Sequence, residues 1–299
     1  MVSSRYGSLV TGVFLVVAGA ASFVGCRSQE ASAPPIARPT VTLNHEKAPL
    51  GSPLEINYKF AVANEAKIEG DYRVMLHVLD ADEELIWTDD HDPPVPTSQW
   101  KGGQTVDYTR TVFIPIYPYV GETLLRIGLY SKTTQQRLRL EGEDAGQKAY
   151  NVGTLQLQPQ TANVFTIFKD GWHPAEVADG NAAVEWQWTR KQATLAFKNP
   201  KKDSAFYLDL DNPGGVFTDQ QQVRVSLGDH VLDEFQLTPK QPLLKKIPIT
   251  AAQLGAADMR ELQITVDKTF VPMVLTNGTS KDPRELGVRV FHASISPTS

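Results

Sequence analysis

Residues 72–80 read YRVMLHVLD, and their side chains alternate in character along the segment. Because successive side chains of a β-strand point to opposite faces, the segment divides into two rows. The row made mostly of aliphatic residues is Tyr72, Val74, Leu76 and Val78, and the other row is Arg73, Met75, His77 and Leu79. This pattern predicts a strand that packs one face against a hydrophobic core.

The same period-two alternation recurs on both sides of this segment, in short runs separated by Gly, Pro, Asn and Asp. Candidate strands between residues 41 and 159 are VTLNHE, LEINYKFAV, YRVMLHVLD, LIWTDD, VDYTRTVFIP, TLLRIGLYS, QRLRL and VGTLQLQP. So many short strands without a convincing helix are typical of an antiparallel β-sandwich of immunoglobulin or fibronectin type. We therefore predict an immunoglobulin-like domain at residues 39–158.

A polar break, QPQTAN at residues 158–163, separates this block from a second series of strand patterns. The second series predicts a jelly-roll-like sandwich over residues 163–298. Within it, a hairpin is expected to turn at Gly228-Asp229, and a single helical turn is expected after Thr250, which can serve as its N-cap. The fold class expected for the chain is thus all-β, with two antiparallel sandwiches.

The N-terminal region has the features of an export signal. An apolar run from Leu9 to Val24 has the length of a secretory h-region and is short for a membrane span. It ends at Gly25-Cys26, and this sequence resembles the bacterial lipobox, which implies cleavage before Cys26 and lipidation of its thiol. An ordinary signal peptide, or an uncleaved anchor with an incidental cysteine, is the alternative. We expect a lipoprotein signal peptide at residues 1–25, and the lipidated cysteine with a flexible tether at residues 26–38.

Charge and cysteine content restrict the partners. Removal of residues 1–25 takes away Arg5 and leaves 28 basic against 34 acidic residues, a formal charge of −6. This balance argues against a nucleic-acid partner, which favours a basic face. Acyl chains on Cys26 would hold the protein to a membrane. The Arg that follows Cys26, in place of an inner-membrane retention Asp, implies by resemblance to lipoproteins a cell-envelope location at the outer membrane.

Few residues of the chain form a recognisable catalytic or metal-binding motif. Asp89, Asp90, His91 and Asp92 could ligate a metal or act as acid and base, but consecutive loop residues diverge, which favours a structured loop ahead of a buried Trp100. A ligand-contacting loop is the remaining alternative. Asp209 and Asp211 share one side of a strand and could hold a structural calcium, although a solvated strand face is favoured. We therefore expect no catalytic residue, no metal and no cofactor.

Three ordered motifs in the second half carry a resemblance to a known family. They are GWHPAE at residues 171–176, EWQWT at 185–189 and SKDPRELGV at 280–288. They resemble the pattern of a β-sandwich module attached to bacterial glycosyltransferases and other envelope polysaccharide proteins. The first half is more weakly similar to the sandwich that follows membrane glycosyltransferases, through HVLD at 77–80 and DHDPP at 90–94. The resemblance implies envelope glycan biology and supplies no catalytic residue.

The tryptophans and charged residues of these motifs are the candidates for ligand contact. Trp186 and Trp188 are two apart in a strand, share a face and are expected in the sandwich core. Trp172 lies at a strand end and is the tryptophan expected to contact a ligand. His173, Glu176, Asp282 and Arg284 complete the candidate site. A bond from Arg284 to Glu176 or Asp282 would be a structural clasp if it lies under the Trp172 loop, and a sugar-hydroxyl site if it is exposed beside the tryptophans.

Two functions follow from these observations. The first is a non-catalytic surface lipoprotein that binds or helps assemble an envelope or extracellular polysaccharide through its second domain. The second is a scaffold lipoprotein whose sandwiches dock a protein partner in an envelope export or assembly complex.

Overall fold

A computed structural model describes residues 33–298, without the side chains of residues 182 and 183. The predicted signal peptide, the lipidation site at Cys26 and most of the predicted tether lie outside the described residues. Within them, no helix is long and apolar enough to cross a membrane. The first strand begins at Ala37, two residues before the predicted start of the first domain.

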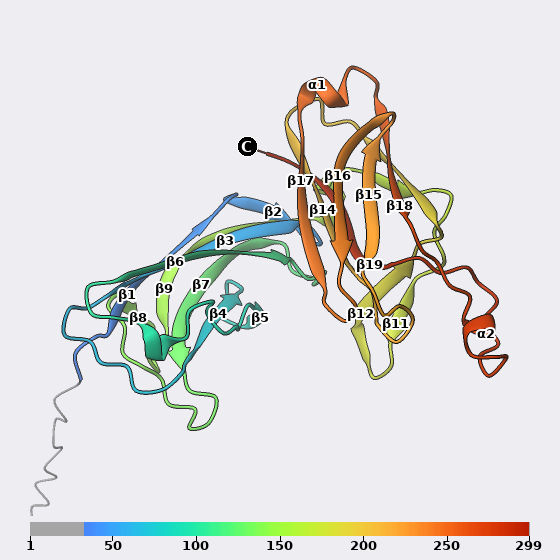
Figure 1. The fold of residues 1–299 in the computed structure, drawn as a ribbon. Coiled ribbons are helices and arrows are strands. Elements are labelled where there is room, and N and C mark those ends of the chain that lie inside the picture. The colour runs from blue at the N-terminus through green and yellow to red at the C-terminus, as the bar shows by residue number, and fades with distance from the viewer. Residues whose placement is uncertain (1–32, 299) are drawn as a thin grey trace, which may run out of the picture. The chain divides into compact units, whose positions relative to one another are not determined.

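The N-terminal sandwich consists of two sheets (Figure 1). In the smaller sheet the strand order is β1 (Ala37–Leu43), β3 (Pro53–Val62) and β6 (Thr105–Phe113). In the larger sheet it is β2 (Lys47–Pro49), β9 (Tyr150–Gln158), β7 (Gly121–Tyr130), β4 (Arg73–Leu79) and β5 (Leu85–Thr88), with β8 (Glu143–Asp144) also paired to β9. All pairings are antiparallel except that of β2 with β9. This is the immunoglobulin-like arrangement predicted from the sequence.

Strand β4 shows why this half folds as a sandwich. Val74, Leu76 and Val78 lie on one face, as the alternation predicted, and the structure shows that this face is completely buried in the core. Met75 and His77 occupy the opposite face, which is the outer face of the larger sheet. The predicted strand QRLRL does not form as such: Arg137 makes an isolated bridge to Tyr130, and the residues that follow bond to Leu129 and to residues 36–37. The sandwich also contains a 3₁₀ turn, η1 (Thr97–Gln99), directly before the buried Trp100.

The C-terminal sandwich has two antiparallel five-stranded sheets, and it follows the 3₁₀ turn η2 (Gln160–Ala162). One sheet has the order β10 (Thr166–Phe168), β13 (Gln192–Lys198), β18 (Met259–Val266), β15 (Gln221–Leu227) and β16 (His230–Leu237). The other has the order β11 (Glu176–Ala178), β12 (Asn181–Trp188), β19 (Arg289–Pro297), β14 (Ser204–Asp211) and β17 (Leu243–Ile249). Their facing sides enclose a core of aliphatic residues and two phenylalanines. The two-sandwich, all-β fold class is confirmed.

Two local predictions in this half are also confirmed. Strands β15 and β16 form a hairpin in which Leu227 pairs with His230 across a turn with Gly228 at φ 58°. Helix α1 (Ala251–Leu254) is capped by Thr250, whose hydroxyl accepts from the Gln253 amide in a capping box. The turn α2 (Pro272–Leu275) was not predicted; it lies in the long connection between β18 and β19 (Figure 1).

The buried apolar residues separate into two clusters along the chain. All buried members of the first lie between residues 37 and 157, and all buried members of the second lie between residues 195 and 295. This separation is consistent with the predicted boundary near residues 158–163. That the two sandwiches fold as independent domains stays a prediction.

Candidate functional site

Trp172 is held by the body of the second sandwich. Its indole is partly buried against the core cluster, and its Nε1 donates to the Thr194 carbonyl at 2.9 Å. The Phe168 ring meets it edge to face, with 4.8 Å between ring centroids. The polar end of this indole is therefore already satisfied by the protein, and the geometry describes a core anchor.

His173 continues this anchoring. Its side chain is 6 % exposed, and its Nε2 lies 2.7 Å from the Glu285 carbonyl oxygen. Its backbone amide donates to the Trp188 carbonyl at 2.9 Å. His173 therefore ties the segment after Trp172 to the segment that leads into β19.

Glu176, Asp282 and Arg284 are brought together, as the sequence proposed. Arg284 Nη1 donates to Glu176 Oε1 at 2.7 Å, and its Nη2 donates to Asp282 Oδ2 at 2.7 Å. The hydrogen bonds from Arg284 are the largest cause that lowers the pKa of Asp282, to about 2, and its two acidic partners raise the pKa of Arg284. The three side chains are between 25 and 33 % exposed, so the group is a clasp that still reaches solvent.

Trp186 and Trp188 do not lie in the core between the sheets, which corrects the sequence-based expectation. Val288 and Val290 belong to the core cluster, so Arg289 between them points to the other face of the sheet. Because Trp188 is paired directly with Arg289, it shares that outer face, and so does Trp186 two residues earlier. Trp188 is nevertheless only 7 % exposed, because the Phe270 ring packs on it at 5.6 Å between centroids.

Arg289 packs against the aromatic rings on this outer face. Its guanidinium carbon lies 5.2 Å from the centroid of the Trp186 ring and 5.5 Å from that of Phe291. The same guanidinium donates in a bidentate fashion to Asp211, at 2.8 and 2.6 Å. Asp211 is buried and paired with arginine, which corrects the expectation of a solvated strand face at this residue. Asp209 pairs instead with His292, at 3.1 Å.

The two charged groups and the rings share one surface. Glu176 is paired in register with Trp186, so the Arg284 clasp adjoins the Arg289 stack on the same side of the sheet. We call this surface the aromatic sheet face and define it by Glu176, Trp186, Asp211, Arg289 and Phe291. Trp186 Nε1 lacks a hydrogen-bond partner among the described residues. The surface combines half-buried ring faces with carboxylates and guanidinium groups held in fixed positions.

The acidic loop of the first sandwich keeps Asp89 and His91 together, with 3.4 Å between Asp89 Oδ2 and His91 Nδ1, whereas Asp90 lies beside His77, so the predicted divergence holds only in part. Asp89 is buried and accepts from Tyr58 Oη at 2.7 Å and from Arg110 Nε and Nη2 at 2.9 Å each. Burial alone would raise the pKa of Asp89, but the hydrogen bonds from Arg110 and Tyr58 lower it overall. His91 is buried against Tyr108, with Nε2 2.7 Å from its hydroxyl. Among residues 33–298, no group of three or more His, Cys, Asp or Glu is placed to hold a metal.

Comparisons with known proteins find only weakly similar structures. No family model matches the chain, and no curated protein matches it. Among solved structures, a family GH115 4-O-methyl-α-glucuronidase is 17 % identical over 48 % of this chain and 19 % of its own length, with a TM-score of 0.32. This chain thus spans about a fifth of that enzyme.

Carbohydrate-binding modules are among the other similar structures. The CBM22-1–CBM22-2 tandem of Paenibacillus barcinonensis Xyn10C is 12 % identical over 88 % of this chain and 93 % of its own, with a TM-score of 0.29. A CBM36 domain of a xylanase from the hindgut metagenome of Trinervitermes trinervoides is 8 % identical over 46 % and 99 %, with a TM-score of 0.27. Scores this low assign no ligand to the present chain.

The sequence missed Arg289 and Phe291 as members of the site. Both lie in the segment LGVRVFHASI at residues 286–295, where period-two alternation places them on the face opposite the valines. That signal shows a shared face, but it does not identify Asp211, 78 residues away, as the partner of Arg289.

Proposed function

We propose that this protein is a non-catalytic, lipid-anchored envelope protein that binds polysaccharide through the aromatic sheet face. The observation that carries the proposal is the placement of Trp186 between two fixed charged groups, Glu176 with Arg284 on one side and Arg289 with Asp211 on the other. A sugar ring presents an apolar face of C–H groups and an edge of hydroxyls. The Trp186 indole can stack on the apolar face of the sugar. The carboxylate and guanidinium groups can form hydrogen bonds with its hydroxyls.

The electrostatics of the Arg284 clasp beside this face favour binding over catalysis at Asp282. Glycoside hydrolysis needs a carboxylic acid whose pKa is raised so that it can protonate the leaving oxygen. Asp282 has the opposite perturbation, because Arg284 lowers its pKa to about 2. A carboxylate kept ionised in this way is suited to accept hydrogen bonds from hydroxyls.

Binding assays on a substituted aromatic sheet face test this proposal. We expect Trp186→Ala to weaken binding of a polysaccharide ligand by about tenfold or more, since buried aromatic anchors dominate such contacts. The full-length protein in detergent would be screened on an array of bacterial envelope and extracellular glycans, and hits would be measured by isothermal titration. Phe165→Ala, which removes a ring that is 60 % exposed, is the matched control and should leave the affinity unchanged. Equal affinities for wild type and Trp186→Ala, or no glycan bound by folded protein, would contradict the proposal.

A second candidate function, docking of a protein partner, is favoured by the turn α2. Met273, Val274 and Leu275 are 40, 70 and 48 % exposed, and three consecutive exposed apolar side chains are typical of a contact surface. A stoichiometric protein partner that copurifies from detergent-solubilised membranes with wild type, and is lost with Val274→Asp, would support this function.

A further inference from the structure

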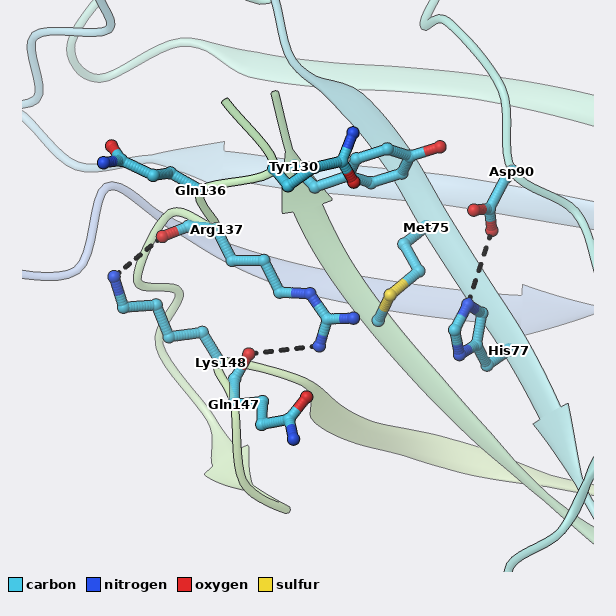
Figure 2. Close-up of a pocket in the computed structure, with 9 residues that line it drawn as sticks. Met75, His77, Asp90, Tyr130, Gln136, Arg137, Gln147 and Lys148 are labelled. Atoms are coloured by element: carbon cyan, nitrogen blue, oxygen red, sulfur yellow. Dashed lines mark hydrogen bonds and ion pairs between the residues drawn. The ribbon is translucent and has the colours of Figure 1, made fainter. Parts of the chain in front are cut away.

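The first sandwich contains a polar pocket on the outer face of its larger sheet, separate from the aromatic sheet face in sequence and chemistry. The cavity has a volume of about 850 Å³. Met75 and His77 from β4 and Tyr130 from the end of β7 line it, together with Asp90, residues 135–137 and residues 147–148. Figure 2 shows Arg137 and Lys148 on one side of the pocket and the pair of His77 and Asp90 on the other.

The positive wall of the pocket is built by two segments that brace each other. Arg137 Nη1 donates to the Gln147 carbonyl at 3.1 Å, and Lys148 Nζ donates to the Arg137 carbonyl at 2.8 Å (Figure 2). Gly128 in β7 lets this wall approach, because a Cβ there would meet the Lys148 carbonyl oxygen at 3.2 Å. The guanidinium is thus held in place before any ligand arrives.

Backbone strain is concentrated around the same cavity. Seven non-glycine residues among those described have positive φ, and three of them line this pocket: Gln135 at 59°, Gln147 at 54° and Lys148 at 56°. Such conformations cost free energy and cluster at binding sites, where the surrounding structure holds them. Their concentration here marks the pocket as a built site.

The charges of the pocket are unbalanced in favour of an anion. No carboxylate forms an ion pair with Arg137 or Lys148 within residues 33–298, although the chain as a whole is acidic. The nearby cations of the sheet and its loops are already paired: Arg73 and Lys132 with Asp92, and Arg126 with Glu83. Asp90 is the single carboxylate in the lining, and its Oδ1 lies 3.8 Å from His77 Nε2. Arg137 therefore has unused donors that face an open cavity.

We infer that this pocket binds a carboxylate-bearing sugar unit of a polysaccharide. Arg137 pairs with the sugar carboxylate, for which a guanidinium has the matching planar geometry. Tyr130 provides a ring for the apolar face of the sugar. Asp90, the carboxylate of the lining, accepts hydrogen bonds from its hydroxyls. This site does not depend on the aromatic sheet face, and a protein with both would hold a chain at two points.

Paired uronate and neutral probes test the inference. Full-length protein that carries Trp186→Ala, which removes the central indole of the aromatic sheet face, would be titrated with trisaccharides of galacturonate, glucuronate and mannuronate. Each is compared with its carboxyl-reduced counterpart. We expect at least one uronate to bind about tenfold or more tightly than its reduced form, and Arg137→Gln to abolish that preference.

Two further variants separate recognition from folding. Arg137→Lys retains the charge and should keep part of the preference, whereas Lys67→Gln removes an exposed cation elsewhere in the same sandwich and should change nothing. Equal thermal unfolding of the variants confirms that the fold is intact. If every uronate binds no better than its reduced form, or if Arg137→Gln keeps the full preference, the inference is overturned.

Discussion

Arg284 illustrates how much a single residue does in this fold. It joins the β11 segment, through Glu176, to the connection that leads into β19, through Asp282. The two carboxylates are 106 residues apart in the chain, 282 minus 176, so the bond closes a large loop as well as placing charge on the aromatic sheet face. The contribution of this ion pair to the free energy of unfolding depends on pH, and this dependence separates it from any role in ligand contact.

The stability contributed by Asp282 should be lost in acid. Its pKa in the folded protein is about 2, below the value of 3.8 for a free side chain. A lowered pKa means that the folded state binds its proton less readily than the unfolded state does. The contribution is therefore fully present above about pH 4 and disappears as the pH falls toward 2.

We accordingly expect Asp282→Asn to unfold at lower urea concentration than wild type at pH 7, and the difference to shrink as the pH falls from about 4 to about 2. Urea titrations followed by tryptophan fluorescence at pH 7, 4 and 2.5 would measure it. Asp258→Asn, which breaks an exposed ion pair with Lys201, is the control and should have a much smaller effect at pH 7. A difference that stays constant across this pH range would contradict the assignment.

At the scale of elements, the turn that ends at Gly171 fixes how the Trp172 segment meets β13. Gly171 has φ 86°, and a Cβ there would lie 1.9 Å from the Gln192 carbonyl oxygen. Only glycine allows both this conformation and this close approach. The glycine that opens GWHPAE is thus explained by packing.

Alanine substitution at two glycines tests this explanation. Gly171→Ala should destabilise the protein by more than about 2 kcal/mol. The backbone at Gln192 would have to move away from the new Cβ, and the alanine itself would adopt a strained positive φ. Gly180→Ala should cost only about 1 kcal/mol. Gly180 also has positive φ, at 75°, but nothing lies within 4 Å of its added Cβ. Chemical denaturation of both variants measures the difference, and equal losses would show that the close contact is unimportant.

The elements themselves could be read largely from alternation and turn residues. The core row of β4, the Gly228 hairpin and the Thr250 cap follow from local chemistry that needs no tertiary information. The predicted strand QRLRL is reduced to a bridge at Arg137, whose side chain and carbonyl bond to Gln147 and Lys148 in the following loop. Local alternation could not anticipate that contact, and the pocket wall was missed with it.

At the scale of the whole molecule, the predicted attachment to a membrane would depend on a single residue. Cys26 lies outside the described residues, so its lipidation stays a prediction from the lipobox resemblance. We expect the wild-type protein to fractionate with membranes. The Cys26→Ser variant should lack the mass of the acyl chains, and any of it that stays with membranes should still carry its uncleaved signal peptide. Mass spectrometry of the mature N-terminus checks this, and an unmodified Cys26 in membrane-bound wild type would contradict it.

Sequence by itself determined the all-β class and the two sandwiches, because periodicity and turn chemistry are local signals, and it offered Glu176 and Asp282 as alternative partners of Arg284, both of which the structure brings to it. The tertiary structure alone decided which face each tryptophan occupies. A period of two shows that Trp186 and Trp188 share a face, but only the pairing of β12 with β19 shows that this face is the outer one. The same holds for Arg289 with Asp211 and for the pocket around Arg137, since strand register and the meeting of distant loops are set by the packing of the whole chain.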